Sequence, residues 1–131
     1  DPGATIGVPV PELPQGHVLV LDNEAVVREA MQELLQGWGW QVHAAADTEE
    51  AKALLARQPV DLLVLDYHLD AGQTGLDAWR VLASAAPAIL ITADRSEAVK
   101  EAAEAAGLIL LYKPLRALAL RSVMRKLFAV R

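Results

Sequence analysis

The chain of 131 residues contains no cysteine, so it can form no disulfide and offers no thiolate to a metal or a substrate. Its apolar runs fall far short of the ~20 residues that a helix needs to cross a bilayer, and we expect neither a transmembrane helix nor a signal peptide. These absences exclude thiol chemistry and disulfide scaffolds, and they predict that this domain does not span a membrane. They fit a cytoplasmic protein, and we expect that location and no membrane contact by this domain.

Acidic residues are absent from Lys113 to the C-terminal Arg131, although the whole chain has a net charge of −5. The bases of this segment suit two different roles. A basic helix can contact nucleic acid, but bases near a helix C-terminus also favour its dipole, and a net negative charge opposes binding of a polyanion. We therefore predict a solvated basic face and no nucleic-acid binding by this domain.

Proline and glycine gather at the start of the chain. Residues 1–16 contain four of the seven prolines and three of the eight glycines, a composition typical of a linker. We predict a linker over residues 1–16 and one folded domain over residues 17–131, a length that can bury a single core. Because no initiating methionine precedes the linker, we expect the domain to come from a longer chain.

Apolar runs alternate with segments of helical periodicity along the rest of the chain. The runs, which predict five strands, are residues 17–21, 40–45, 60–66, 88–92 and 108–112. Each is followed by apolar residues spaced three and four apart, as in Val27, Ala30, Met31 and Leu34, which predicts a helix. Strands that are apolar throughout and joined by helices form parallel sheets covered on both faces. The sequence therefore predicts a doubly wound α/β fold.

Polar residues stand at the carboxyl ends of the predicted strands. Asp22 and Asn23 follow the first strand, Asp66 ends the third, Thr92 ends the fourth, and Lys113 follows the fifth. Each alone is ordinary, and Asn23 alone also fits an N-cap of the first helix. Doubly wound sheets, however, bind ligands beyond the carboxyl ends of their strands. Together these groups suit Mg²⁺, through carboxylate and amide oxygens, and a phosphoryl group, through the hydroxyl and the ammonium.

Four motifs resemble the receiver domains of two-component signalling over about residues 16–131: LDNE, DLLVLDYHLD, ILITAD and LLYKP. The resemblance implies a flavodoxin-like parallel sheet of five strands, in the order 2-1-3-4-5, with five helices. The segments LDNE, QGWGW, DYHLDAGQTGLDAW and AILITADRS are most similar to the C-terminal receivers of bacterial hybrid sensor histidine kinases. We therefore expect the parent chain to be a histidine kinase.

The resemblance also assigns roles to the strand-end residues. It implies that Asp66 accepts a phosphoryl group from the phosphohistidine of a histidine kinase or a histidine phosphotransfer domain, so that the domain itself catalyses at most its own phosphorylation. Thr92 and Lys113 would bind the phosphoryl oxygens, and a cis peptide bond is expected between Lys113 and Pro114. Mg²⁺ would be held by four groups: Asp22, Asn23, Asp66 and the backbone carbonyl of His68.

Two positions depart from the pattern of the family. An aromatic switch residue usually stands three positions before the lysine, where this chain has Leu110, and the nearby aromatic is Tyr112, which shares a strand face with Leu110. Asn23 stands where a second aspartate is usual. It keeps an oxygen ligand but removes one negative charge, so we expect lower Mg²⁺ affinity than an aspartate would give.

Other functions remain open at this point. The main alternative is a degenerate receiver that binds a partner without being phosphorylated. A haloacid-dehalogenase-like phosphatase would need a second aspartate where this chain has His68. A flavin binder would need a phosphate-cradling loop where Asp22 and Glu24 would repel phosphate. The run DYHLDAGQTGLD resembles a calcium loop but has Ala71 where the sharp turn needs glycine. The oligomeric state is left open.

Overall fold

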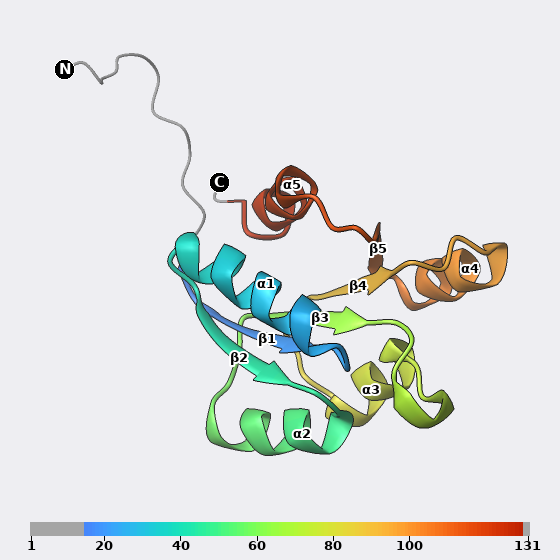
Figure 1. The fold of residues 1–131 in the computed structure, drawn as a ribbon, viewed down its shortest axis with the longest axis horizontal. Helices are drawn as coiled ribbons and strands as arrows, with labels where there is room; N and C mark the ends of the chain where they lie inside the picture. Colours follow the sequence, from blue (N-terminus) through green and yellow to red (C-terminus); the bar gives the residue numbers. More distant parts are fainter. Residues whose placement is uncertain (1–14, 130–131) are drawn as a thin grey trace, which may run out of the picture.

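Five parallel strands form one sheet in the computed structural model, which describes residues 15–129 (Figure 1). The strands are β1 (His17–Leu21), β2 (Gln41–Ala45), β3 (Leu62–Asp66), β4 (Ala88–Thr92) and β5 (Ile109–Tyr112). They lie in the order β2-β1-β3-β4-β5, and each neighbouring pair is parallel. The predicted doubly wound fold and its strand order are confirmed. Most of the predicted linker over residues 1–16 lies outside the described residues.

Three strands begin later than the apolar runs predict: β3 begins two residues late, at Leu62, and β2 and β5 each begin one residue late. Hydrogen bonds explain the last two differences. The backbone N–H of Trp40 donates to Leu35 and that of Leu108 donates to Ala103, so both residues still close the preceding helix. These 6→1 bonds are the usual way in which a helix satisfies its last carbonyls. Apolar residues at a helix end and at a strand start look alike in the sequence, which explains the difference.

Helices connect the strands: α1 (Ala25–Gly37), α2 (Thr48–Arg57), α3 (Gly75–Leu82), α4 (Glu97–Ala106) and α5 (Ala117–Leu127), with a short 3₁₀ turn η1 (Asp70–Gly72) before α3. The side chains of Asp47, Thr74 and Ser96 accept hydrogen bonds from backbone N–H groups of α2, α3 and α4, and so start these helices. No helix among residues 15–129 is both long and apolar enough to cross a membrane.

The helices form a layer on each face of the sheet. Helices α1 and α5 cover one face, and α2, α3 and α4 cover the other (Figure 1). Strand β3 is buried along its whole length, with Leu63 and Leu65 facing the second layer and Val64 facing the first. This double coverage explains why the central strands read as continuous apolar runs.

The strand register sets the strand-end residues side by side. Leu21 is paired with Leu65, so Asp22 and Asp66, one residue further along each strand, are neighbours. Thr92 is paired with Tyr112, directly before Lys113. The carboxyl end of the sheet therefore brings together polar side chains that are far apart in the sequence.

Candidate functional site

Three carboxylates surround one ammonium group at the carboxyl end of the sheet. The Nζ atom of Lys113 lies 3.3 Å from Asp22 Oδ2, 3.4 Å from Asp66 Oδ1 and 3.2 Å from Glu24 Oε1. Asp22 and Asp66 are buried, with 3% and 6% of their surface exposed, whereas Glu24 is exposed. The pocket therefore combines two desolvated acids with one partly buried base. We call these four residues, Asp22, Glu24, Asp66 and Lys113, the acidic pocket.

Asp66 is held at the end of β3 by the close approach of α3. The N–H of Gly75, the first residue of α3, donates to the carbonyl of Tyr67 at 2.6 Å. A Cβ atom on Gly75 would lie only 2.5 Å from the backbone oxygen of Asp66. Glycine is therefore needed at this position, because any larger residue would push the helix away from the strand end that carries Asp66.

Burial and like charge both act on the pKa of Asp66. Desolvation and, to a smaller extent, the charge of Asp22 raise it, the ammonium of Lys113 lowers it, and the net result is a pKa of about 6. For Lys113, partial burial by itself lowers the pKa, but the carboxylates of Asp66 and Asp22 and the hydrogen bond to Glu24 outweigh it and leave the pKa raised. Lys113 is therefore held as a cation, and Asp66 is mainly ionised at neutral pH.

Glu24 is the member of the acidic pocket that the sequence did not predict as a site residue. It occupies the N-cap position of α1, where its side chain makes no capping bond, and its N–H donates to Asp22 Oδ1 at 2.9 Å. Interpreting Asn23 as the N-cap is therefore wrong. The signal in the sequence was the run of three polar residues after β1, but only the structure shows that the third one reaches Lys113.

Three predicted residues lie outside the contacts of the acidic pocket. Asn23 donates from Nδ2 to Asp70 Oδ1 at 2.8 Å. The hydroxyl of Thr92, which is 1% exposed, accepts a bond from the N–H of Asp94 at 3.0 Å. No described contact joins the Thr92 hydroxyl or the carbonyl of His68 to a pocket carboxylate. The structure thus unites Asp22, Asp66 and Lys113, and the direct roles of the other three stay predictions.

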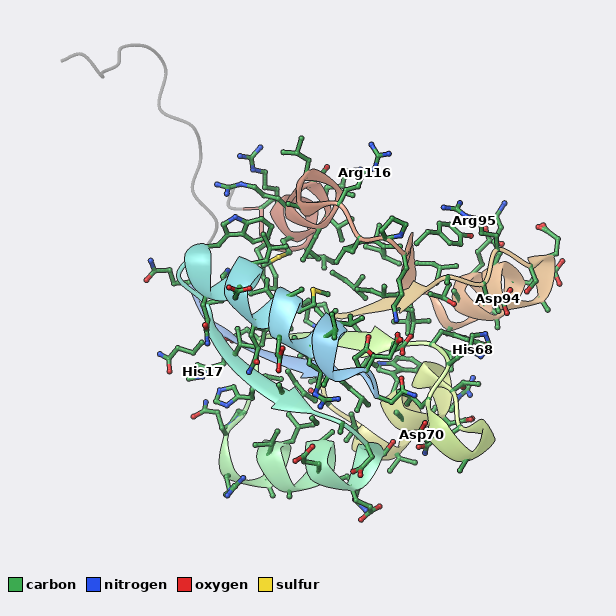
Figure 2. All side chains as sticks on the ribbon, in the orientation of Figure 1. His17, His68, Asp70, Asp94, Arg95 and Arg116 are labelled. Atoms are coloured by element: carbon green, nitrogen blue, oxygen red, sulfur yellow. The ribbon has the colours of Figure 1, made fainter. Side chains whose placement is uncertain are left out.

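The loop between β3 and α3 is tied to three other parts of the fold. His68 Nε2 lies 2.9 Å from Asp94 Oδ2, beyond β4, and Figure 2 shows these two side chains together at the edge that also carries Asp70. Hydrogen bonds from the Ser96 N–H and from His68 lower the pKa of Asp94 to about 2. The remaining ties are the Asn23 bond to Asp70 and a 2.7 Å bond from Thr48 in α2 to Gln73.

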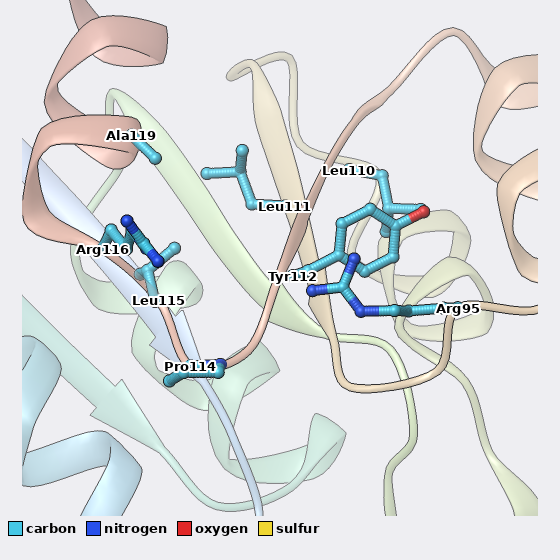
Figure 3. Close-up of a pocket in the computed structure, with 8 residues that line it drawn as sticks. All are labelled: Arg95, Leu110, Leu111, Tyr112, Pro114, Leu115, Arg116 and Ala119. Carbon is cyan, nitrogen blue, oxygen red and sulfur yellow. The ribbon is translucent and has the colours of Figure 1, made fainter.

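The aromatic group near the site is Tyr112, at the end of β5. Figure 3 shows the guanidinium of Arg95 lying across its ring, and the guanidinium carbon is 4.4 Å from the ring centroid. Tyr112 and Leu110 line the same hollow, of about 310 Å³. Directly after Tyr112, the peptide bond between Lys113 and Pro114 is cis, as the resemblance implies.

The side chains of the acidic pocket fit a divalent cation of the magnesium type. Carboxylate oxygens of Asp22, Glu24 and Asp66 lie within 4.8 Å of one another, and within residues 15–129 this is the single group of three side chains able to ligate a metal in this way. Mg²⁺ prefers oxygen ligands and few protein contacts. The ammonium of Lys113, held among the same oxygens, shows that the pocket already accommodates a positive charge.

Comparison with known sequences shows one family. The response regulator receiver domain family matches residues 18–125. The chain is 32% identical over 120 residues to the alginate biosynthesis transcriptional regulatory protein AlgB of Pseudomonas aeruginosa, covering 89% of this chain and 27% of AlgB. It is 36% identical over 83 residues to the regulatory protein VirG of Rhizobium rhizogenes, covering 62% of this chain and 34% of VirG. The chain thus spans about a third of the length of these relatives.

Solved structures share the fold. The chemotaxis protein CheY4 of Vibrio cholerae superposes with a TM-score of 0.75 at 22% identity, covering 87% of this chain and 99% of CheY4. A response regulator receiver protein from Burkholderia phymatum gives a TM-score of 0.75 at 27% identity, covering 88% of this chain and 96% of that protein. The five-stranded sheet described above is therefore the fold of these proteins.

Proposed function

The chain belongs to the response regulator receiver domain family of two-component signalling, and we propose that it accepts phosphoryl groups on Asp66. The observation that carries this proposal is the position of Asp66, a buried carboxylate at the carboxyl end of β3 whose Oδ1 lies 3.4 Å from the ammonium of Lys113. Family members interact with histidine kinases or phosphotransfer proteins, so the phosphoryl donor is a phosphohistidine.

The transfer requires an ionised Asp66. A carboxylate oxygen attacks the phosphorus atom, the new O–P bond forms, the P–N bond to the donor imidazole breaks, and the imidazole keeps the electron pair and takes a proton. Lys113 is poised to neutralise the incoming phosphoryl oxygens, because its ammonium already contacts Asp66. Thr92 supplies a hydroxyl at the end of the adjacent strand, where it would donate to a phosphoryl oxygen.

Receiver domains bind Mg²⁺ at such an acidic pocket, and here Asp22, Glu24 and Asp66 supply carboxylates. We propose that the Asn23 amide oxygen and the His68 carbonyl complete the set. When bound, the cation supplies positive charge to the phosphoryl oxygens. Asn23 stands where the family usually has an acid, and Glu24, the next residue, supplies a carboxylate beside it. This supports a receiver with a working metal site over the degenerate receiver.

The finer assignments are also proposals. The motif wording supports a C-terminal receiver of a hybrid histidine kinase, preceded by a linker over residues 1–16, in the cytoplasm. The curated relatives AlgB and VirG are described instead as regulatory proteins, so a regulator with an output domain is the other parent to test. No nucleic-acid contact is proposed for this domain, because its base-rich helix α5 belongs to a chain of net charge −5.

Phosphorylation of the purified chain tests the central proposal. Wild type, Asp66→Asn and the control Asp61→Asn, which alters an exposed acid at the opposite end of the sheet, are incubated with acetyl phosphate or a histidine kinase and Mg²⁺. We expect labelling of wild type and the control and none of Asp66→Asn. Labelling of Asp66→Asn would place the acceptor elsewhere. If a competent donor labels neither wild type nor the control, the degenerate receiver becomes the better reading.

A further inference from the structure

One side-chain hydrogen bond joins the loop after β1 to the loop after β3. Asn23 Nδ2 donates to Asp70 Oδ1 at 2.8 Å, although the two residues are 47 positions apart. A carboxylate only accepts hydrogen bonds, so the bond decides which end of the planar amide faces Asp70. The amide oxygen of Asn23, which is the one atom of this side chain that can ligate a cation, is therefore turned away from Asp70.

The same bond brings a negative charge to the edge of the acidic pocket. Asn23 directly follows Asp22, and the loop that carries Asp70 starts directly after Asp66. Among residues 15–129, no lysine, arginine or histidine forms an ion pair with Asp70. No neighbouring base among these residues neutralises the charge of Asp70, but the residue is exposed, so water screens its attraction for a cation in the pocket without cancelling it.

We propose that Asp70 is a positioning residue of the cation site, which fixes the Asn23 amide with its oxygen available to Mg²⁺ and supplies the negative charge that Asn23 lacks. This inference rests on the proposed function, because it requires Mg²⁺ to bind at the acidic pocket. Partners that orient metal ligands by hydrogen bonds generally contribute about ten-fold or more to metal affinity. A bond that merely joined two loops would change stability but not metal affinity.

Calorimetric titration of the full chain with Mg²⁺ tests the role of Asp70. Asp70→Ala removes both the acceptor and the charge, and we expect about ten-fold weaker binding. Asp70→Asn keeps an oxygen acceptor for Asn23 and removes only the charge, so we expect about three-fold weaker binding. Glu104→Gln removes one charge from an exposed position on α4 and should leave the affinity unchanged. Thermal unfolding of each variant verifies that it is folded at the titration temperature.

A second pair of variants separates positioning from charge. In an Asn23→Ala background, Asp70→Ala has no amide left to position, so its effect should shrink to the roughly three-fold loss expected from charge alone. Equal losses for Asp70→Ala and Asp70→Asn, or an undiminished loss in the Asn23→Ala background, would overturn the positioning role while leaving the metal site intact. Absence of Mg²⁺ binding by the wild-type chain would overturn the metal site itself, and with it the role of Asp70.

Discussion

The two ends of the sheet carry different ionisable groups, and the fold shifts their pKa values in opposite directions. At the carboxyl end, three carboxylates share the ammonium of Lys113. At the amino end, the rings of His17 and His43 are stacked with centroids 5.2 Å apart, and His17 Nδ1 lies 3.0 Å from His43 Nε2. Asp61 accepts a bond from the backbone N–H of His17. Figure 2 shows His17 at one side of the molecule and His68, Asp70 and Asp94 at the other.

The difference shows where the fold accepts unfavourable charge. At the carboxyl end, burial and Asp22 raise the pKa of Asp66, so the folded chain binds that proton more tightly than the unfolded chain does. At the amino end, burial and the neighbouring His17 lower the pKa of His43, so the folded chain binds that proton less tightly. Acidification from neutral pH should therefore stabilise one end and destabilise the other. The end for which we propose cation and phosphoryl binding is therefore the one that keeps a buried carboxylate ionised at neutral pH at a cost in stability.

The largest expected effect comes from neutralising Asp66. In EDTA at pH 7, Asp66→Asn should raise the free energy of unfolding by about 2 kcal/mol, because it removes a buried like charge. The gain should be lost as the pH falls through about 6 toward the ordinary aspartate pKa, where wild-type Asp66 is itself protonated. Urea unfolding at several pH values measures it. A gain that does not change with pH would show that packing, and not charge, is its origin.

Removing the base of the acidic pocket should lower the free energy of unfolding. Lys113→Met leaves the three carboxylates without a counter-charge, and we expect the chain to fold but to lose about 1–2 kcal/mol at pH 7 in EDTA. It should also be phosphorylated poorly. In the Asp66→Asn background the stability loss should become smaller, since one of the repelling charges is gone. Additive losses in this double-mutant cycle would contradict the ion pair between Lys113 and Asp66.

Placing an acid at position 23 tests the charge balance beside the acidic pocket. Asn23→Asp removes the donor to Asp70 and sets two carboxylates against each other, so we expect a loss of about 1 kcal/mol without metal. It should also bind Mg²⁺ about five-fold more tightly, because the cation relieves this repulsion. Adding Asp70→Asn should recover the stability. Equal Mg²⁺ affinities of wild type and Asn23→Asp, measured by calorimetry, would refute the charge argument.

The smallest effect belongs to the amino end. His43→Gln, made in the Asp66→Asn background, should cost about 1 kcal/mol at pH 7.5 through the lost bond to His17. The Asp66→Asn single variant, which keeps His43, should lose stability as the pH falls below the ordinary histidine pKa. Its unfolded chain then takes up a proton at His43 that the folded chain resists. The double variant should lose less over the same range. Parallel pH profiles of the two proteins would show that His43 does not titrate as proposed.

The sequence predicted the position of the site better than its contacts. Strand ends of a parallel sheet share one edge, so Asp22, Asp66 and Lys113 were brought together by topology alone. The bond between Asn23 and Asp70, and that between His68 and Asp94, depend on loop conformation and rotamers that no periodicity encodes. Glu24 was missed because its contact with Lys113 depends on where α1 begins. The linker over residues 1–16 stays a prediction.

The ties of the loop between β3 and α3 limit how this segment can evolve. Its residues reach Asn23, Thr48 and Asp94 on three different elements, and each partner is met by a residue at a fixed offset from Asp66. Insertion or deletion of one residue near the start of the loop would move all three partners out of register at once, whereas a substitution alters one. Among homologous sequences, substitutions in this loop should therefore be more common than changes in its length.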